Sequence, residues 1–164
     1  MNLDFSPDEL AFQAEARAWL ATNVPVLNSG EPLPSMDTAA GFAAHQEWER
    51  KLADARWSVV SWPEEFGGRD ASLVEWVIFE EEYYRAGAPG RVSQNGIFLL
   101  APIIFDHGTA EQQARFLPSM ATGETIWAQA WSEPEAGSDL ASLRSTATKV
   151  DGGWKLNGQK TWSS

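Results

Sequence analysis

The feature that most constrains the fold of this chain is a change in the pattern of residue types after Gly123. Before it, helix-start signals recur together with apolar residues at three- and four-residue spacing, which is typical of amphipathic helices. After it, short β-prone segments alternate with the turn signals Asp151-Gly152-Gly153 and Asn157-Gly158. The sequence therefore predicts an α+β chain, with a helical domain over residues 1–122 and a strand-rich domain over residues 123–164.

Two helices are predicted near the N-terminus. The run Ser6-Pro7-Asp8-Glu9 combines a capping serine, a proline suited to the first turn and a glutamate that can reach back to the cap amide. It predicts a helix that ends near Thr22. Residues 28–37 are predicted to form a loop, and a second helix is predicted over about residues 38–55. One face of this helix is predicted to carry His45, Trp48, Leu52 and Ala55.

Three more helices are predicted in the same domain. One begins at a capping signal and covers about residues 72–87. Residues 97–105 are apolar on all sides, which predicts a buried helix with a bend at Pro102. The last covers about residues 109–118 and is expected to stop by the proline at its end.

The second domain is predicted to contain short strands over residues 145–150, 154–156 and 159–164. So short a region is too small for a stable sheet with two covered faces. More chain or another subunit is therefore expected to complete it, and the sequence is interpreted as a fragment of a longer protein.

Composition excludes several classes of function. Twelve Lys and Arg against 23 Asp and Glu give a formal net charge of −11, which argues against nucleic acid as the main partner. The absence of cysteine excludes disulfides and thiolate metal sites. The longest apolar run, residues 97–105, is too short to span a bilayer, and the N-terminus has no apolar signal core. We therefore expect a soluble cytoplasmic protein.

The segment from Trp127 to Leu140 combines small residues, backbone donors and tryptophans, which suits a large flat ligand with a phosphate tail. Gly137 lets a ligand approach the backbone, and Ser138 adds a hydroxyl donor. Taken alone, these two residues and Asp139 are more typical of an ordinary helix cap.

The other residues of interest in the second domain are also ambiguous on their own. Ser132 precedes Glu133-Pro134. The proline favours an extended backbone where the chain leaves a strand, but the same residues are also typical of a plain loop. Trp131 and Trp162 could stack on a planar ring system, whereas any single tryptophan more often packs in a core.

Other polar residues suggest structural roles. His45 and His107 match no metal-ligand spacing, so both are interpreted as structural and no metal is expected. The run Glu80-Glu81-Glu82 is interpreted as a solvated helix face. The chain contains no phosphate-binding loop motif and no nucleophile elbow.

In their order along the chain, these segments resemble the acyl-CoA dehydrogenase family over nearly the whole length. The parts that resemble its N-terminal helices and loops are FSPDELAFQAEARAWL, WSVVSWPEEFGGRDASLVEW, EEEYYRAGAP and IIFDHGTAEQQARFLPSMATGE. The parts that resemble its two flavin signatures are WAQAWSEPEAGSDLASL and NGQKTWSS. The pattern is similar to a bacterial branch of the family, although Glu135 stands where the family usually has glycine.

The resemblance implies a helical N-terminal domain, the beginning of an antiparallel β-barrel-like middle domain, and FAD bound between the middle domain and a C-terminal bundle. Ser132 would hydrogen-bond the flavin ring, Trp162 would pack on it, and Ser164 would bond near its reactive edge. Gly137 and Ser138 would contact the FAD pyrophosphate, and Ser138 also the phosphate arm of the substrate. The full set of implied cofactor-binding residues is Gln129, Ala130, Trp131, Ser132, Gly137, Ser138, Trp162, Ser163 and Ser164.

The family reaction is the α,β-dehydrogenation of an acyl-CoA thioester, with hydride transfer to flavin N5. Its base belongs to the C-terminal domain, so no catalytic residue is assigned to this chain, and the 164 residues alone are expected to bind FAD poorly and to be inactive. The resemblance also implies a role in fatty acid or lipid catabolism, electron-transfer flavoprotein as acceptor, and a homo-oligomer, either a dimer or a tetramer. The acyl group would lie near residues 95–100.

Two alternatives remain open from the sequence. The chain could be a non-catalytic subunit or scaffold of the same fold. It could also belong to a related acyl-CoA oxidase or flavin monooxygenase. The chain length and branching of the acyl group are not determined by these residues.

Overall fold

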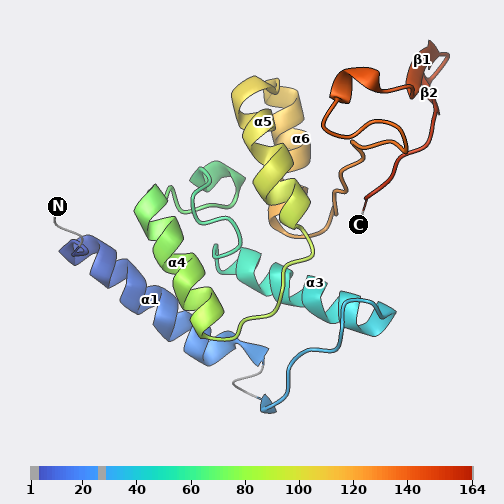
Figure 1. The fold of residues 1–164 in the computed structure, drawn as a ribbon. Coiled ribbons are helices and arrows are strands. Elements are labelled where there is room, and N and C mark those ends of the chain that lie inside the picture. Colours follow the sequence, from blue (N-terminus) through green and yellow to red (C-terminus); the bar gives the residue numbers. More distant parts are fainter. Residues whose placement is uncertain (1–3, 26–28, 164) are drawn as a thin grey trace. The chain divides into compact units, whose positions relative to one another are not determined.

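The structure is a computed structural model that describes residues 4–25 and 29–163 (Figure 1). The chain divides into two compact units, residues 1–126 and residues 127–164. The first unit is helical and the second contains a short antiparallel sheet, which confirms the predicted α+β class. No helix among the described residues is long and apolar enough to cross a membrane.

Among its described residues, the first unit contains α-helices, a 3-10 turn and a π-helical segment. In chain order they are α1 (Pro7–Asn23), α3 (Ala39–Asp54), η1 (Glu64–Phe66), α4 (Leu73–Arg85), η2 (Asn95–Leu100), α5 (Ala101–His107) and α6 (Ala110–Ala121). Helices α1 and α4 pack side by side, as Figure 1 shows.

Capping boxes start three of these helices, including the two for which the sequence analysis named a capping signal. At α1, the Glu9 amide donates to Ser6 Oγ over 3.2 Å, and the Glu9 carboxylate accepts from the Ser6 amide over 2.6 Å. Equivalent reciprocal pairs stand at the starts of α4 and α6. Such a cap stabilises a helix by about 0.5–2 kcal/mol, because it satisfies amides that have no partner inside the helix.

The core of the first unit lies where α1, α3, α4 and the loop after α3 meet. The rings of Trp57 and Phe79 stack with their centroids 5.2 Å apart. The Arg69 guanidinium lies 3.9 Å from the Trp57 ring centroid. The buried members of this core are Ala16, Leu20, Val24, Trp48, Leu52, Trp57, Val60, Phe79 and Tyr83.

Two predictions about the later helices are wrong. Helix α6 does not stop by Pro118 but continues to Ala121, because its last turn buries Leu117, Met120 and Ala121. The apolar run 97–105 is not buried on all sides, since the side chain of Ile103 is 55% exposed. The run is also not one continuous α-helix: the π-helical segment η2 ends at Leu100, and α5 follows with a proline in its first turn.

The prediction of a solvated face at residues 80–82 holds for Glu81, which is exposed, but is wrong for Glu82. Glu82 is only 2% exposed, and Arg17 of α1 donates to its carboxylate over 2.8 and 2.9 Å. Arg85 forms a second ion pair with the same carboxylate. The hydrogen bonds from Arg17 hold the pKa of Glu82 below its ordinary value, against the effect of burial. Glu82 therefore joins α1 to α4.

The second unit contains a 3-10 turn, η3 (Leu140–Ser142), and one hairpin. Strands β1 (Thr146–Val150) and β2 (Gly153–Asn157) are antiparallel, with Thr146 opposite Asn157 and Val150 opposite Gly153. Both strands are exposed along their whole length. The third predicted strand does not form over residues 159–163, because the Thr161 amide bonds to the loop at Ser132 rather than to a strand.

Candidate functional site

Within the second unit, the loop around Ser132 is fastened to the segment that follows β2. The backbone amide of Thr161 donates to the Ser132 carbonyl over 2.9 Å. The Lys160 ammonium donates to the Trp131 carbonyl over 3.1 Å. These bonds bring together the two segments that resemble flavin signatures, although about thirty residues separate them in the sequence.

A buried carboxylate organises this arrangement. Glu133 accepts from the Arg144 amide over 2.7 Å, from the Ser145 amide over 3.0 Å and from the Lys160 ammonium over 3.0 Å. Ser145, the Arg144 amide and Lys160 together lower the pKa of Glu133 to about 2. A carboxylate with so low a pKa is a weak base, so Glu133 serves as an anchor for the loop rather than as a proton acceptor.

The backbone turns sharply after this anchor. The Glu133 amide donates to the Ala136 carbonyl over 2.8 Å, and the Ala136 amide donates back to the Glu133 carbonyl over 3.2 Å. Gly137 and Ser138 follow at the surface. A Cβ atom built on Gly137 would meet nothing within 4 Å, so space is open beside this backbone. Asp139 is the N-cap residue of the 3-10 turn Leu140–Ser142, as the alternative interpretation predicted, although its side chain makes no capping bond.

The tryptophans of the predicted flavin site are not core residues. Trp131 is 65% exposed and Trp162 is 85% exposed. Trp162 also has a φ of 57°, a left-handed conformation that is strained for a bulky side chain. Neither ring is buried within this unit, so both are open to stacking on a planar ligand.

The remaining predicted site residues lie on the same unit. Gln129, Ala130 and Ser163 are exposed, and Ser132 is half-buried. Ser164 lies outside the described residues. Bonds through Trp131, Ser132 and Lys160 therefore link the segment 129–132 to the segment 160–163, while Gly137 and Ser138 follow the turn that leaves Glu133.

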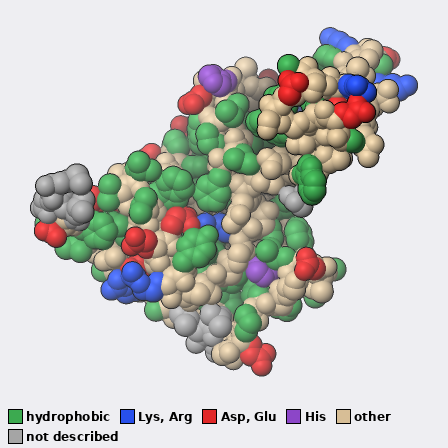
Figure 2. Space-filling view, viewed as in Figure 1, with side chains coloured by type: hydrophobic (Ala, Val, Ile, Leu, Met, Phe, Trp, Pro, Cys, Tyr) green, Lys and Arg blue, Asp and Glu red, His purple; other side chains and the backbone are tan. Residues whose placement is uncertain are grey.

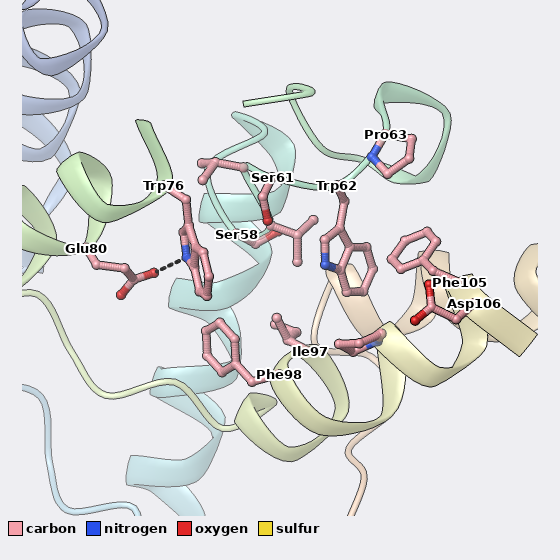
Figure 3. Close-up of a pocket in the computed structure, with 13 residues that line it drawn as sticks. Ser58, Ser61, Trp62, Pro63, Trp76, Glu80, Ile97, Phe98, Phe105 and Asp106 are labelled. Atoms are coloured by element: carbon pink, nitrogen blue, oxygen red, sulfur yellow. Dashed lines mark hydrogen bonds between the residues drawn. The ribbon is translucent and has the colours of Figure 1, made fainter. Parts of the chain in front are cut away.

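The first unit contains a separate cavity of about 480 Å³ (Figure 3). Four aromatic side chains contribute to its walls: Trp76 stacks on Phe98 with centroids 5.9 Å apart, and Trp62 meets Phe105 edge to face at 5.2 Å. The residues that line it are Ser58, Val59, Val60, Ser61, Trp62, Pro63, Trp76, Glu80, Ile97, Phe98, Pro102, Phe105 and Asp106. Two of them fall in the stretch 95–100, where an acyl group was expected.

Sequence reasoning missed the buried polar residues of this unit. Arg91 is buried and donates to the Glu80 carboxylate over 3.0 Å, and the Arg91 guanidinium lies 4.2 Å from the Tyr83 ring centroid. Glu49 is buried on α3 and accepts from the Ser93 amide over 3.0 Å. No local pattern marks these residues, because each finds its partner on a distant segment.

The two histidines have different surroundings. His45 is buried, and its ring nitrogens lie 2.7 Å from the Gly90 carbonyl oxygen and 3.2 Å from that of Pro34, which fits the structural role predicted for it. His107 is exposed at the end of α5. Among the described residues, no group of three or more His, Cys, Asp or Glu side chains is placed to hold a metal ion.

The surface of the first unit carries apolar patches. Figure 2 shows hydrophobic side chains over the part of this unit that α4 and α5 form. The exposed apolar residues on α4, η2 and α5 are Leu73, Val74, Val77, Tyr84, Leu99 and Ile103. Such patches mark surfaces that bind other groups more often than scattered single residues do.

Comparison with known proteins identifies relatives for both units. Residues 6–124 match the acyl-CoA dehydrogenase N-terminal domain, and residues 128–164 match the acyl-CoA dehydrogenase middle domain. The acyl-CoA dehydrogenase IpdE1 of Mycobacterium tuberculosis is 42% identical over 93% of this chain and 40% of its own length. The isovaleryl-CoA dehydrogenase of Arabidopsis thaliana is 40% identical over 61% of this chain and 25% of its own length.

Solved structures share the fold. The ChsE4-ChsE5 complex from Mycobacterium tuberculosis aligns with a TM-score of 0.76 and 33% identity, over all of this chain and 40% of the other. The Tcur3481-Tcur3483 steroid ACAD aligns with a TM-score of 0.77 and 27% identity, over all of this chain and 41% of the other. The chain thus spans about 40% of the length of such relatives. The matches to both domains place this chain in the acyl-CoA dehydrogenase family.

Proposed function

We propose that the natural polypeptide carrying this sequence is an FAD-dependent acyl-CoA dehydrogenase that acts on the α,β-bond of an acyl-CoA thioester. Family membership supports this proposal, and the observation that carries it is the bonded pairing of residues 131–133 with residues 160–161. Bound FAD would supply a hydride acceptor, and the residues of this chain would hold and orient it.

The exposed groups of the second unit fit such a cofactor. The segment Gln129–Ser132 would line the flavin ring, and Trp162 would pack against it with its exposed face. Ser132 would hydrogen-bond the ring, and Ser163 and Ser164 would lie at the same end. The open backbone at Gly137 suits close approach of a pyrophosphate, which the Ser138 hydroxyl would also contact. Ser138 would in addition bind the phosphate arm of the thioester.

The base that removes the α-proton is not assigned to a residue of this chain. Glu133 does not suit that role, because its low pKa and its three hydrogen-bond donors keep it ionised and occupied. Electron-transfer flavoprotein is the acceptor that we propose, and a cytoplasmic role in lipid catabolism is part of the same proposal.

The oligomer is proposed to contain at least two chains of this fold, as a homo-oligomer or with a related chain. The second possibility is supported by a structure at 33% identity, which is a complex of two differently named chains. The native mass of the polypeptide, with mass spectrometry of its subunits, distinguishes the two.

The reaction is tested by anaerobic addition of acyl-CoA thioesters to the flavin-loaded natural polypeptide. Loss of flavin absorbance near 450 nm, on the order of the full band, is the expected result with at least one thioester. The panel should include straight, branched and steroid-derived acyl groups, because one structural relative is a steroid ACAD. A flavin band unchanged by every thioester would favour the non-catalytic alternative, and rapid oxygen consumption afterwards would favour an oxidase or monooxygenase.

A further inference from the structure

Two Asn-Gly pairs in this chain lie in opposite surroundings. The sequence contains this dipeptide twice, as Asn95-Gly96 and as Asn157-Gly158. Asn95 begins η2, and Gly96 is buried. Asn157 is the last residue of β2, and both Asn157 and Gly158 are exposed. The same pair of reacting groups is therefore present at one constrained position and at one open position.

An Asn-Gly pair can modify itself. The backbone nitrogen of the glycine attacks the side-chain carbonyl carbon of the asparagine, because this closes a five-membered ring and glycine has no Cβ atom to obstruct the approach. A bond forms between this nitrogen and Cγ, the bond from Cγ to Nδ2 breaks, and Nδ2 leaves as ammonia with the proton of the backbone amide. Water then opens the cyclic imide at either carbonyl and gives aspartate or isoaspartate. Water is the co-reactant, and nothing is oxidised or reduced.

The structure leaves Asn157-Gly158 open to this reaction. The pairing of β1 with β2 stops where Thr146 lies opposite Asn157, so Gly158 lies beyond the ladder. Among the described residues, none accepts a hydrogen bond from the Gly158 backbone amide. The ends of secondary-structure elements also open at a low cost in free energy. The nitrogen that must attack is therefore not held by the fold.

Packing requires glycine at position 158. A Cβ atom built on Gly158 would lie 2.0 Å from Ser145 Oγ and 2.8 Å from Ser145 Cα, which is a severe clash with side chain and backbone. Ser145 is itself fixed, since its amide donates to the Glu133 carboxylate over 3.0 Å. A larger residue at position 158 would therefore disturb the anchor of the loop, so the reactive dipeptide follows from the packing of this unit.

The pair in η2 is held in place by hydrogen bonds on both sides. The Ile97 amide donates to the Ser93 carbonyl over 3.1 Å, and the Ala101 amide donates to the Gly96 carbonyl. Ring closure must rotate the peptide group that joins Asn95 to Gly96, and this rotation breaks the helical geometry. The reaction at Asn95 therefore has to wait until η2 opens.

We propose that Asn157 is a site of spontaneous modification, and that its conversion to aspartate and isoaspartate loosens the junction between Ser132 and Thr161. Isoaspartate routes the main chain through the former side chain, which lengthens the backbone by one carbon atom. This change falls just before Lys160 and Thr161, whose bonds to the loop hold the junction together.

The new carboxylate also adds negative charge where two carboxylates already lie. Asn157 lines a small recess of about 310 Å³ together with Glu133 and Glu135. The cations beside these two carboxylates are engaged, because Lys160 pairs with Glu133 and Arg144 pairs with Glu135. A third carboxylate competes for the same two cations and repels both glutamates, which weakens the junction further.

The site is tested by ageing the natural polypeptide in mildly alkaline buffer, because ring closure requires loss of the amide proton. Peptide mass spectrometry then measures conversion at both asparagines. Asn157 should convert at least about tenfold faster than Asn95, a ratio that corresponds to a modest free energy of opening for η2. Equal rates at the two positions, or no conversion at Asn157, would overturn the proposed site.

Hydrogen exchange of the segment that contains Thr161 tests the loosening, because the Thr161 amide donates to the Ser132 carbonyl. Exchange should be faster in the aged wild type than in the fresh wild type. It should stay unchanged on ageing of Asn157→Gln, whose longer side chain cannot close the five-membered ring. Asn95→Gln is the matched control and should age as the wild type does.

Two results would overturn the loosening: unchanged exchange after conversion at Asn157, or equally faster exchange in aged Asn157→Gln. If Asn157→Gln is already perturbed when fresh, the comparison of fresh with aged wild type decides the question. Neither flavin nor thioester takes part in these measurements, so their outcome is independent of the dehydrogenation proposal.

Discussion

The backbone amide of Thr161 donates to the carbonyl oxygen of Ser132 over 2.9 Å, and this bond joins the two segments that we assign to the flavin. Lys160 strengthens the same junction through the Trp131 carbonyl and the Glu133 carboxylate. The exposed side chains of Trp131 and Trp162 therefore belong to segments that are fixed to one another before any ligand binds. Such preorganisation lowers the entropy lost on binding.

Replacement of Gly137 by alanine should weaken FAD binding and leave the fold intact. A Cβ atom at this position meets nothing within 4 Å in the protein, so its steric cost arises only against a ligand. Crowding of this kind costs about 1–3 kcal/mol, which corresponds to a Kd about five- to 150-fold higher. FAD titration of the flavin-stripped natural polypeptide measures the effect.

Gly153→Ala is the control for that substitution. A Cβ atom at Gly153 also meets nothing within 4 Å, and this residue lies on β2 outside the proposed site. It should bind FAD as the wild type does. Equal Kd values for the two variants would contradict the placement of the pyrophosphate beside Gly137.

The acid stability of the second unit should depend on Glu133. Its pKa is lowered from 4.5 to about 2 in the folded protein, so the stability that it contributes is present above about pH 4.5 and is lost as the pH falls towards 2. The amide NMR signals of Arg144 and Ser145, which donate to this carboxylate, should titrate with a midpoint near 2 and not in Glu133→Gln. A midpoint at 4.5 would contradict the anchoring role.

Tyr83→Phe should destabilise the first unit by about 1–3 kcal/mol, because it leaves the buried Trp48 indole N–H and the part-buried Pro89 carbonyl without their partner. Trp48 Nε1 donates to the Tyr83 hydroxyl over 2.7 Å, and that hydroxyl donates to the Pro89 carbonyl over 2.5 Å. Burial also raises the pKa of Tyr83 to about 12, so the hydroxyl remains a donor at neutral pH.

Denaturant unfolding measures this loss against a neighbouring control. Tyr84 is the next residue along α4 and is 68% exposed, so Tyr84→Phe should change the free energy of unfolding by less than about 0.5 kcal/mol. Equal effects of the two substitutions would show that the hydrogen bonds of Tyr83 do not stabilise the core.

The sequence predicted the helix starts correctly, because each start depends on residues that are close together in the chain. The capping pairs Ser6–Glu9 and Ser72–Glu75 are three residues apart, so the helix starts could be identified directly. The burial of Glu82 could not, because its partner Arg17 is 65 residues away. The sequence predicted a strand over residues 159–164, but the amide of Thr161 bonds to the loop at Ser132, and no ladder forms over the described residues 159–163.

The candidate sites likewise have features that the sequence identified and features that only the structure reveals. Resemblance identified the segments around Ser132 and Trp162, whereas their hydrogen-bonded junction through Lys160 and Glu133 was not predicted. The cavity beside Ser58 depends on the packing of three segments, the loop after α3, α4 and the η2–α5 helix. No spacing in the sequence encodes a void, so only the folded structure reveals it.

The most direct test of the account is a measurement of flavin retention by the natural polypeptide and its Trp162→Leu variant. Each is incubated with excess FAD and passed through a desalting column, and the absorbance of bound flavin is compared with protein concentration. We predict that the unsubstituted protein retains near-equimolar flavin and that Trp162→Leu retains much less. A colourless unsubstituted protein, or equal retention by both, would contradict the assignment of a flavin site to these residues.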